Sequence, residues 1–329
     1  MDTIIDLESK KIKLNLNFLK TKKILITGAT GLVGLYMTSF LKKEKNSEIT
    51  CWINNSIPEY LKGVFKNCKI IQHDITDQTF VLPEQYDIII HAAGYGQPLK
   101  FVKDKIKTIK INTEATSKLF NFLKKDGQFL FISSSEVYNG LELKKIKENL
   151  MGNTNSDHFR ACYIEGKKCG EAICNAYAEL GYHVKIARLS LAYGPGTKLN
   201  DERVFSTFIK KGLLNDKIDL IDGGEAIRTY CYIVDAVEMM LNVLFYGKHN
   251  IYNIGGSSIT SILNLAKIVG NLLNKEVTTP NIGKPLQGNP QIVNIDCSRY
   301  IEEFNKTNYY DLEYGINKTI DWYKNLLEK

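Results

Sequence analysis

The chain has 329 residues, a formal net charge of +7 and a pI near 8.8, with 44% hydrophobic and 24% charged residues. This length exceeds the ~100–150 residues of a usual single core, so we expect one large α/β unit with a smaller added lobe. The lysines are scattered rather than gathered in basic tracts, which argues against a nucleic-acid partner and is compatible with an anionic small substrate.

No apolar run approaches the ~18 residues that a membrane span needs, so no membrane partner is expected. The acidic start MDTIIDLESKK is unlike a signal peptide. The seven cysteines form no CxxC pair. We therefore expect reduced thiols, no metal site and a cytoplasmic location. Residues 1–22 are expected to be an N-terminal extension, either an extra helix or a docking arm.

A glycine-rich turn follows the first expected strand, Ile24 to Thr27, in the stretch KILITGATGLVG. Gly28, Gly31 and Gly34 stand in GxxGxxG spacing and lead into an apolar helix. This order predicts the pyrophosphate site of a dinucleotide. Gly28 makes the sharp bend, Gly31 lets the backbone approach the pyrophosphate, and Gly34 lets the helix lie close on the sheet. Further cofactor contacts are expected from Thr30, Leu32 and Val33.

The second and third expected strands end in polar residues. EITCWI (48–53) ends at Asn54 and Asn55, where an acidic residue would bind the ribose of NAD and an arginine the 2′-phosphate of NADP. An asparagine there can hydrogen-bond the ribose hydroxyls, so NAD is the expected cofactor. KIIQ (69–72) leads to Asp74 and Ile75. The Asp74 carboxylate either accepts from the adenine amino group or simply holds a turn, and the sequence leaves both open.

The fourth and fifth strands end in small and polar residues. After Asp87 to His91 come Ala92, Ala93 and Gly94, whose small side chains let a flat cofactor pass. A helix expected over 105–125 contains Asn112, which is either a surface residue or holds a water or carbonyl near the site. The fifth strand ends at three serines, 133–135, followed by Glu136.

Tyr163 and Lys167 lie one turn apart on the next expected helix, residues 161–180, before the sixth strand HVKIAR. A free tyrosine has a pKa of about 10, and a nearby lysine charge and a positive nicotinamide ring both favour the phenolate. Such a tyrosine takes a hydroxyl proton while a hydride leaves the same carbon to NAD. Ser134 would orient that hydroxyl.

The alternation of strands and helices predicts an α/β fold with a Rossmann-type doubly wound parallel sheet. We expect an NAD-binding domain over 23–190, with a return segment at about 228–255. The smaller mixed α/β substrate-binding lobe is expected over 191–329.

These motifs resemble the extended short-chain dehydrogenase/reductase family over nearly the whole chain from Lys22 on. GATGLVG resembles its glycine motif, Ser134, Tyr163 and Lys167 its catalytic triad, and Asn112 a frequent fourth member. YGPG (193–196) and RTYCYIVDAV (228–237) resemble its substrate-domain motifs. The resemblance implies NAD, a nucleotide-sugar substrate and oxidation of the sugar at C4. It also implies a homodimer through the helix that carries Tyr163, where Gly166 and Gly170 would permit close approach.

Within that family the chain is most similar to UDP-glucuronate decarboxylases, in KIKTIKINT, the 134–138 run, RACYIEGKK (160–168) and DERVFSTFI (201–209). Dehydratases carry an aspartate where this chain has Ser135, which disfavours 4,6-dehydration. Glu136 and Arg228 would place the sugar acid. The alternative for Arg228 is that it binds the diphosphate, as in related epimerases. Gln97 and Arg203 are further expected substrate contacts, and Ser135 is counted with the catalytic group.

Two departures from the decarboxylase pattern bear on the substrate. Leu191 replaces an asparagine before YGPG, and the loop GYGQP (94–98) differs from the decarboxylase loop. A 4-dehydrogenase, 4-epimerase or 4,6-dehydratase of UDP-, GDP- or dTDP-hexoses therefore stays an alternative. A non-catalytic NAD-binding regulatory protein and a basic RNA-binding derivative are remote alternatives, because Tyr163 and Lys167 are both kept.

Overall fold

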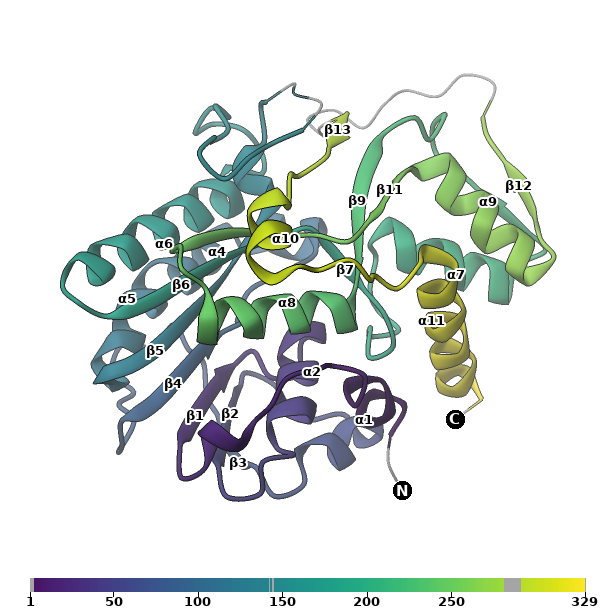
Figure 1. Cartoon of the computed structure of the whole chain (residues 1–329). Helices are drawn as coiled ribbons and strands as arrows, with labels where there is room; N and C mark the ends of the chain where they lie inside the picture. The colour runs from purple at the N-terminus through teal and green to yellow at the C-terminus, as the bar shows by residue number, and fades with distance from the viewer. Residues whose placement is uncertain (1–2, 142, 144, 281–290, 329) are drawn as a thin grey trace.

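The computed structural model describes residues 3–141, 143, 145–280 and 291–328. Seven strands form one sheet in the order β10-β6-β5-β4-β1-β2-β3, and every adjacent pair is parallel (Figure 1). The strand order runs outward in both directions from the centre, as a doubly wound sheet does. The expected Rossmann-type fold is confirmed. The strands are β1 (Lys23–Thr27), β2 (Glu48–Ile53), β3 (Lys69–Gln72), β4 (Tyr86–His91), β5 (Leu123–Ser134), β6 (His183–Leu189) and β10 (Ile251–Ile254).

Helices cover both faces of this sheet (Figure 1). One face packs against α2 (Leu32–Leu41) and α8 (Ile233–Tyr246), and the other against α4 (Lys105–Asn112), α5 (Glu114–Leu119) and α6 (Ala161–Glu179). A sheet buried on both faces needs apolar strands without alternation. β1 meets this need with four fully buried residues in a row.

The helix expected over 105–125 is interrupted. α4 ends at Asn112, Thr113 leaves helical geometry at φ −117° and ψ −79°, and α5 begins at Glu114. A 3₁₀ turn over Phe120–Phe122 then leads directly into β5, which begins at Leu123. The helical periodicity of the sequence was therefore right for 105–119, and the last residues of the expected helix belong to the sheet.

The return segment at about 228–255 divides between two sheets. β9 (Ile227–Tyr232) pairs with β7 (Leu191–Tyr193), β11 (Ser258–Ser261) and β13 (Ile292–Val293), away from the large sheet. α8 and β10 return to the large sheet. The chain thus passes from the smaller sheet back to the large sheet at Tyr232–Ile233, where β9 ends and α8 begins. The division into domains at 190/191 stays a prediction.

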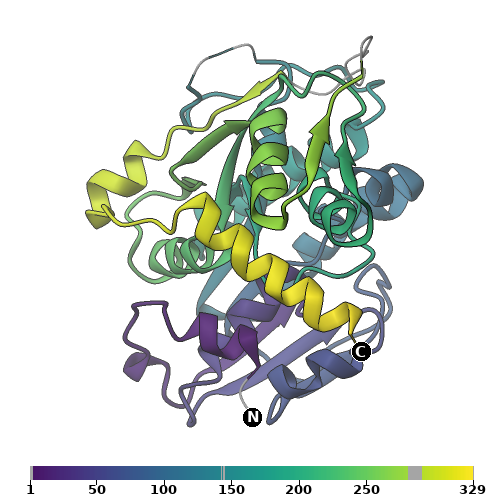
Figure 2. The same ribbon diagram turned by 90° about the vertical axis from the view of Figure 1, so that its right-hand side faces the viewer.

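Most of the remaining elements lie on the side of the molecule that faces the viewer in Figure 2, with α11 crossing it. They include a two-stranded parallel sheet. Their bounds are α3 (Pro98–Lys103), α7 (Val204–Leu214), β8 (Lys217–Asp219), α9 (Ile262–Leu273), β12 (Glu276–Thr278), α10 (Ser298–Phe304) and α11 (Leu312–Leu327). Further 3₁₀ turns span Asn17–Leu19, Glu59–Phe65 and Ser135–Tyr138.

The N-terminal segment contains a short helix, α1 (Ile4–Ser9), which begins with a capping box between Thr3 and Asp6. Asp6 also accepts from Ser39 of α2 at 2.7 Å and pairs with Lys42 at 3.0 Å. The hydroxyl of Tyr232 donates to Glu8 at 2.8 Å. The segment is therefore docked on α2 and tied to the start of α8, and the two ends of the chain lie on the same side of the molecule (Figures 1 and 2).

Among the described residues, no helix is both long enough and apolar enough to span a bilayer. All seven cysteines are free thiols.

Candidate active site

The glycine turn lies between β1 and α2 and is shaped by its neighbours. Gly28 has φ +64°, and a Cβ there would lie 2.6 Å from the Ala92 carbonyl oxygen and the Ala93 Cα. A Cβ at Gly34 would lie 2.5 Å from the Gly28 carbonyl oxygen. Gly28 is thus required for the bend, and Gly34 for the close approach of α2, as expected from the sequence.

Gly31 is different, because a Cβ there meets only the Gly28 carbonyl oxygen, at 3.2 Å. It is the N-cap of α2, so the N–H groups of Leu32 and Val33 in the first turn have no acceptor within the helix. Exposed glycine backbone beside unpaired N–H donors at the positive end of a ten-residue helix suits a diphosphate. The half-buried Thr30 precedes Gly31 in the same turn.

A buried hydrogen-bond chain fixes the segment opposite the turn. His91 at the end of β4 contacts the Ile111 carbonyl through Nε2 at 3.1 Å and the Thr27 hydroxyl through Nδ1 at 2.8 Å. Burial and, to a lesser degree, the Lys167 charge lower the pKa of His91 to about 3. The neutral ring therefore donates to the carbonyl and accepts from Thr27, whose oxygen accepts the Ala93 N–H at 3.2 Å. The path of Ala92 and Ala93 past Gly28 is held in this way.

The residues expected at the adenosine end lie after β2 and β3, two strands that pair in parallel at one edge of the sheet. Asn54 is exposed and donates to Asn55 at 3.3 Å. Asp74 accepts from the backbone and hydroxyl of Thr76 and pairs with Lys107 at 2.6 Å. Asp74 therefore holds a turn here, and its side chain stays 39% exposed, so its role toward adenine stays a prediction. Ile75 is buried in the core.

Tyr163 and Lys167 both lie on α6 and are both buried. The Tyr163 ring stacks on Phe101 of α3, with centroids 4.5 Å apart and an interplanar angle of 9°. Its hydroxyl shares a hydrogen bond with Ser134, which ends β5. The Lys167 ammonium donates to the Ile132 carbonyl at 2.7 Å and lies 5.8 Å from the centroid of the Tyr163 ring. Sequence reasoning placed these three residues together, and the structure does so.

The protonation states differ from the expectation. Burial raises the pKa of Tyr163, although the hydrogen bond with Ser134 and the charges of Arg160 and Arg203 act in the opposite direction. Burial lowers the pKa of Lys167 to about 8. In the chain by itself, desolvation therefore outweighs the neighbouring charges that favour the phenolate, and the contribution of Lys167 stays a prediction.

Asn112 ends α4 and is fully buried rather than at the surface. Its amide nitrogen donates to the Thr108 carbonyl at 2.8 Å, and its side-chain oxygen is buried without a hydrogen-bond partner. Gly166 and Gly170 face this residue, since a Cβ at Gly170 would lie 2.6 Å from the Asn112 carbonyl oxygen. The two glycines thus allow α4 of the same chain to approach α6, and they are no evidence for pairing with a second chain.

Glu136 lies just after Ser134 and Ser135 in the 3₁₀ turn Ser135–Tyr138, and Ser135 is buried. The Glu136 carboxylate pairs with Arg160, the N-cap residue of α6, through Oε1 and Nη2 at 2.6 Å. Its second oxygen is buried and has no hydrogen-bond partner among the residues that the structure describes. Arg228 of β9 faces the same carboxylate, whose charge raises the pKa of Arg228, while burial, the larger effect, lowers it.

Gln97, Asp201 and Arg203 form a second polar group. Gln97 donates to Asp201 at 3.3 Å, and Arg203 forms an ion pair with Asp201 at 2.8 Å. Arg203 also donates to the Ala192 carbonyl of β7 at 3.3 Å. The half-buried Leu191 precedes Ala192 in that strand. The two polar groups flank Tyr163, because Arg160 and Arg203 both act electrostatically on its hydroxyl.

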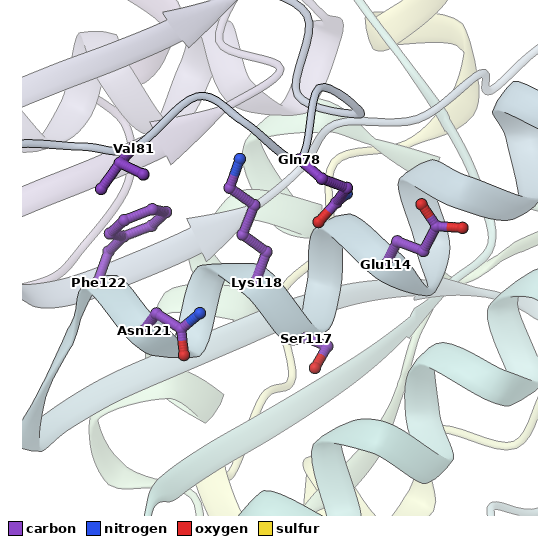
Figure 3. A pocket seen from close by; sticks show the side chains of 7 residues that line it. All are labelled: Gln78, Val81, Glu114, Ser117, Lys118, Asn121 and Phe122. Carbon is purple, nitrogen blue, oxygen red and sulfur yellow. The ribbon is translucent and has the colours of Figure 1, made fainter.

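A separate open hollow of about 490 Å³ lies between α5 and the segment that follows β3 (Figure 3). Both apolar and polar side chains line it, and the Lys118 ammonium donates a hydrogen bond to the Asp77 carbonyl. None of the expected site residues lines it. Its lining residues are Gln78, Val81, Glu114, Ser117, Lys118, Asn121 and Phe122.

Sequence reasoning missed the roles of Thr27, His91, Arg160 and Asp201. Arg160 stands three residues before Tyr163, a spacing that places two side chains on one helix face, so a signal was present. Asp201 lies two residues before Arg203, but nothing in the sequence pairs it with Gln97. The contact of His91 with Thr27 depends on the pairing of β4 with β1, which only the fold supplies.

Comparison with known proteins agrees with this arrangement. Residues 24–255 match the model of a family described as the NAD dependent epimerase/dehydratase family. The chain is 30% identical over 314 residues to UDP-glucuronic acid decarboxylase 1 of Xenopus tropicalis, covering 93% of this chain and 73% of that protein. It is 30% identical to UDP-glucuronic acid decarboxylase 6 of Arabidopsis thaliana, covering 79% of this chain and 77% of the relative.

Among solved structures, UDP-glucuronic acid 4-epimerase from Bacillus cereus, in complex with UDP-glucuronic acid and NAD, superposes with a TM-score of 0.78 at 24% identity. The match covers 92% of this chain and 99% of the epimerase. The family match and the similarity to the decarboxylases show that the chain belongs to the NAD dependent epimerase/dehydratase family.

Proposed function

We propose that this protein is an NAD-dependent enzyme that oxidises a nucleotide sugar at C4, and that its reaction is the decarboxylation of UDP-glucuronate. The observation that carries the proposal is the meeting of Ser134, Tyr163 and Lys167 with the arginine-flanked carboxylate of Glu136. The curated relatives at 28–30% identity, which are UDP-glucuronic acid decarboxylases, support the choice of substrate.

The glycine turn fits a dinucleotide, because Gly31 leaves its outer side open and α2 presents unpaired N–H groups there. We assign the diphosphate to Gly28, Thr30, Gly31, Leu32 and Val33. The adenosine end is assigned to Asn54, Asp74 and Ile75, and the nicotinamide end to Ala92, Ala93, Tyr163 and Lys167. Bound NAD supplies a hydride acceptor for C4 of the sugar and later returns the hydride.

Tyr163 takes the proton of the C4 hydroxyl, and Ser134 orients that hydroxyl through the bond the two residues share. The raised pKa of Tyr163 means that the protein alone holds the phenol protonated. A positive charge beside the ring therefore has to act before Tyr163 accepts a proton. Lys167 contributes charge only below its pKa of about 8 and is held by the Ile132 carbonyl.

The arginines suit a sugar acid carried on a diphosphate. Arg160 and Arg203 both act electrostatically on Tyr163, and Arg228 interacts with Glu136. Arg160 pairs with the Glu136 carboxylate and Arg203 with the Asp201 carboxylate. With C4 oxidised, the C5 carboxyl group becomes β to a ketone. The bond from C5 to the carboxyl carbon then breaks, its electron pair moves toward the C4 oxygen, and a proton is added at C5. We assign Glu136 and Arg228 to the sugar acid, and Gln97 and Arg203 to the rest of the substrate.

The experiment is to incubate purified protein with UDP-glucuronate and NAD and to measure CO₂ and UDP-xylose. Both products are expected. Formation of UDP-galacturonate without CO₂ would show 4-epimerisation instead. Leu191, which removes one polar contact of the decarboxylase pattern, bears on the choice of sugar. Turnover of UDP-, GDP- or dTDP-hexoses alone would favour a 4-dehydrogenase. Ser135, in the place of the acid that dehydration needs, weighs against a 4,6-dehydratase.

We further propose a homodimer and a cytoplasmic location. The exposed apolar residues Leu99, Ile106 and Ile109 on α3 and α4 support the first, since such side chains are usually covered. The free cysteines support the second. Light scattering of the purified protein tests the dimer, and a monomer at micromolar concentration would exclude it.

A further inference from the structure

Arg160 occupies a position in the site that the assigned catalytic groups leave unexplained. Its side chain is 6% exposed, and one of its nitrogens, Nη2, forms the 2.6 Å ion pair with Glu136 Oε1. Hydrogen bonds to buried charged groups are stronger than neutral ones and hold a preferred geometry. With Oε1 engaged, the partnerless oxygen of Glu136 is the one left for a substrate group.

The same guanidinium lies over the ring of Phe101, 5.5 Å from its centroid. Phe101 stacks in turn on Tyr163, and its ring is almost fully buried. The Phe101 backbone is fixed as well, because its carbonyl accepts from Thr108 at 3.1 Å and from Cys162 at 3.4 Å. Arg160 therefore contacts both halves of the reacting site, the carboxylate directly and the tyrosine through one aromatic ring.

We propose that Arg160 is a positioning residue that holds the Glu136 carboxylate and the Phe101–Tyr163 stack in one fixed arrangement. The catalytic role of Glu136 rests on the proposed function. The way in which Arg160 holds Glu136 does not depend on it. The two contacts of residue 160 explain why an arginine, and not a lysine, stands there. A lysine ammonium offers the charge, whereas a planar guanidinium both pairs with a carboxylate and stacks on an aromatic ring.

The test compares wild type with Arg160→Met, Arg160→Lys, Glu136→Gln and the double variant Arg160→Met/Glu136→Gln. Lys62→Met is the control, because Lys62 forms an exposed ion pair with Glu59 in the Glu59–Phe65 turn, outside the site. With UDP-glucuronate, we expect Arg160→Met and Glu136→Gln each to lower kcat by about 10- to 100-fold with KM changed less than about threefold. The double variant should be no slower than the slower single variant. Arg160→Lys should restore part of kcat.

A second measurement needs no turnover. Amide hydrogen exchange of ligand-free protein reports the 3₁₀ turn, where the Glu136 N–H donates to Ser134 and the Asn139 N–H to the Glu136 carbonyl. We expect exchange at these two amides to be about tenfold faster in Arg160→Met and unchanged in Lys62→Met.

The outcomes separate the two proposals. If wild type makes no product from UDP-glucuronate, the proposed function fails, and the exchange rates alone decide the role of Arg160. Unchanged exchange in Arg160→Met would overturn the positioning role. So would losses in kcat that simply multiply in the double variant, or a change confined to KM.

Discussion

Two arginine–glutamate pairs meet α6, and they differ in how completely their hydrogen bonds are used. Arg188 and Glu171 are 2% and 3% exposed and form a closed network. Arg188 donates to both Glu171 oxygens, to the Tyr138 hydroxyl and to the carbonyls of Glu148 and Leu150, while Ser133 donates to Glu171. In the second pair, Glu136 is 20% exposed and keeps one oxygen without a partner.

The difference separates structure from function. A buried ion pair with every group satisfied specifies how elements join and has nothing left for a ligand. A pair with an open acceptor is costly unless something else binds there, and such incomplete satisfaction marks functional sites. We call these the closed pair (Arg188–Glu171) and the open pair (Arg160–Glu136).

The largest expected effect concerns the tyrosine beside the open pair. Tyr163→Phe removes the hydroxyl that accepts the proton but keeps the ring that stacks on Phe101. We expect kcat to fall by about 10²- to 10⁴-fold, with the melting temperature nearly unchanged. Steady-state kinetics and a thermal melt check this. Retained turnover in Tyr163→Phe would contradict the role of Tyr163 as the group that accepts the C4 hydroxyl proton.

The second prediction contrasts the two glutamates directly. Glu171→Gln leaves the Arg188 charge buried without its partner, so we expect a loss of about 3–5 kcal/mol in the free energy of unfolding. Glu136→Gln should lose less, since the Glu136 side chain is 20% exposed, against 3% for Glu171, while activity falls. Urea unfolding measures both, with Glu165→Gln on the exposed side of α6 as control. Equal losses of unfolding free energy in Glu171→Gln and Glu136→Gln would contradict the distinction between the closed pair and the open pair.

Lys167 lies between the pairs, and its titration gives the third prediction. Its pKa is about 8 in the folded chain, against an ordinary value of 10.5. The unfolded chain therefore binds more protons between these pH values, and the stability of the folded state rises with pH through that window, by up to about 3 kcal/mol. Urea titrations at pH 7.5, 9 and 10.5 should show this rise in wild type and a smaller one in Lys167→Met. Parallel curves for the two proteins would refute the assignment.

The fourth prediction contrasts two glycines at the cofactor end of the site, Gly34 and Gly31, and concerns the smallest expected effects. Gly34→Ala places a Cβ against backbone at 2.5 Å and should cost about 1–3 kcal/mol of stability. Gly31→Ala meets only one carbonyl oxygen at 3.2 Å, so we expect little loss of stability but weaker NAD binding. Calorimetric titration with NAD and a melt of both variants separate these. A Gly31→Ala protein that binds NAD as wild type does would contradict the diphosphate assignment.

Features that depend on local sequence were predictable. The strand–turn–helix at Gly28–Gly34 and the Tyr163–Lys167 spacing each depend on neighbours within a few residues, and the structure places them as expected. The closed pair was not predictable from the sequence, because Glu171 and Arg188 come from α6 and β6 and meet only after those elements pack. The rise in the Tyr163 pKa was also out of reach, because it follows from burial by α3 and not from residue order.

The central claim is that the open pair and Tyr163 serve oxidation at C4, and a single-turnover experiment tests it most directly. Enzyme loaded with NAD and in excess over UDP-glucuronate should show a transient rise in the absorbance of the reduced dinucleotide that precedes CO₂ release. Deuterium at C4 of the sugar should slow this rise. Release of CO₂ without any such transient, at a rate indifferent to the C4 label, would contradict the account.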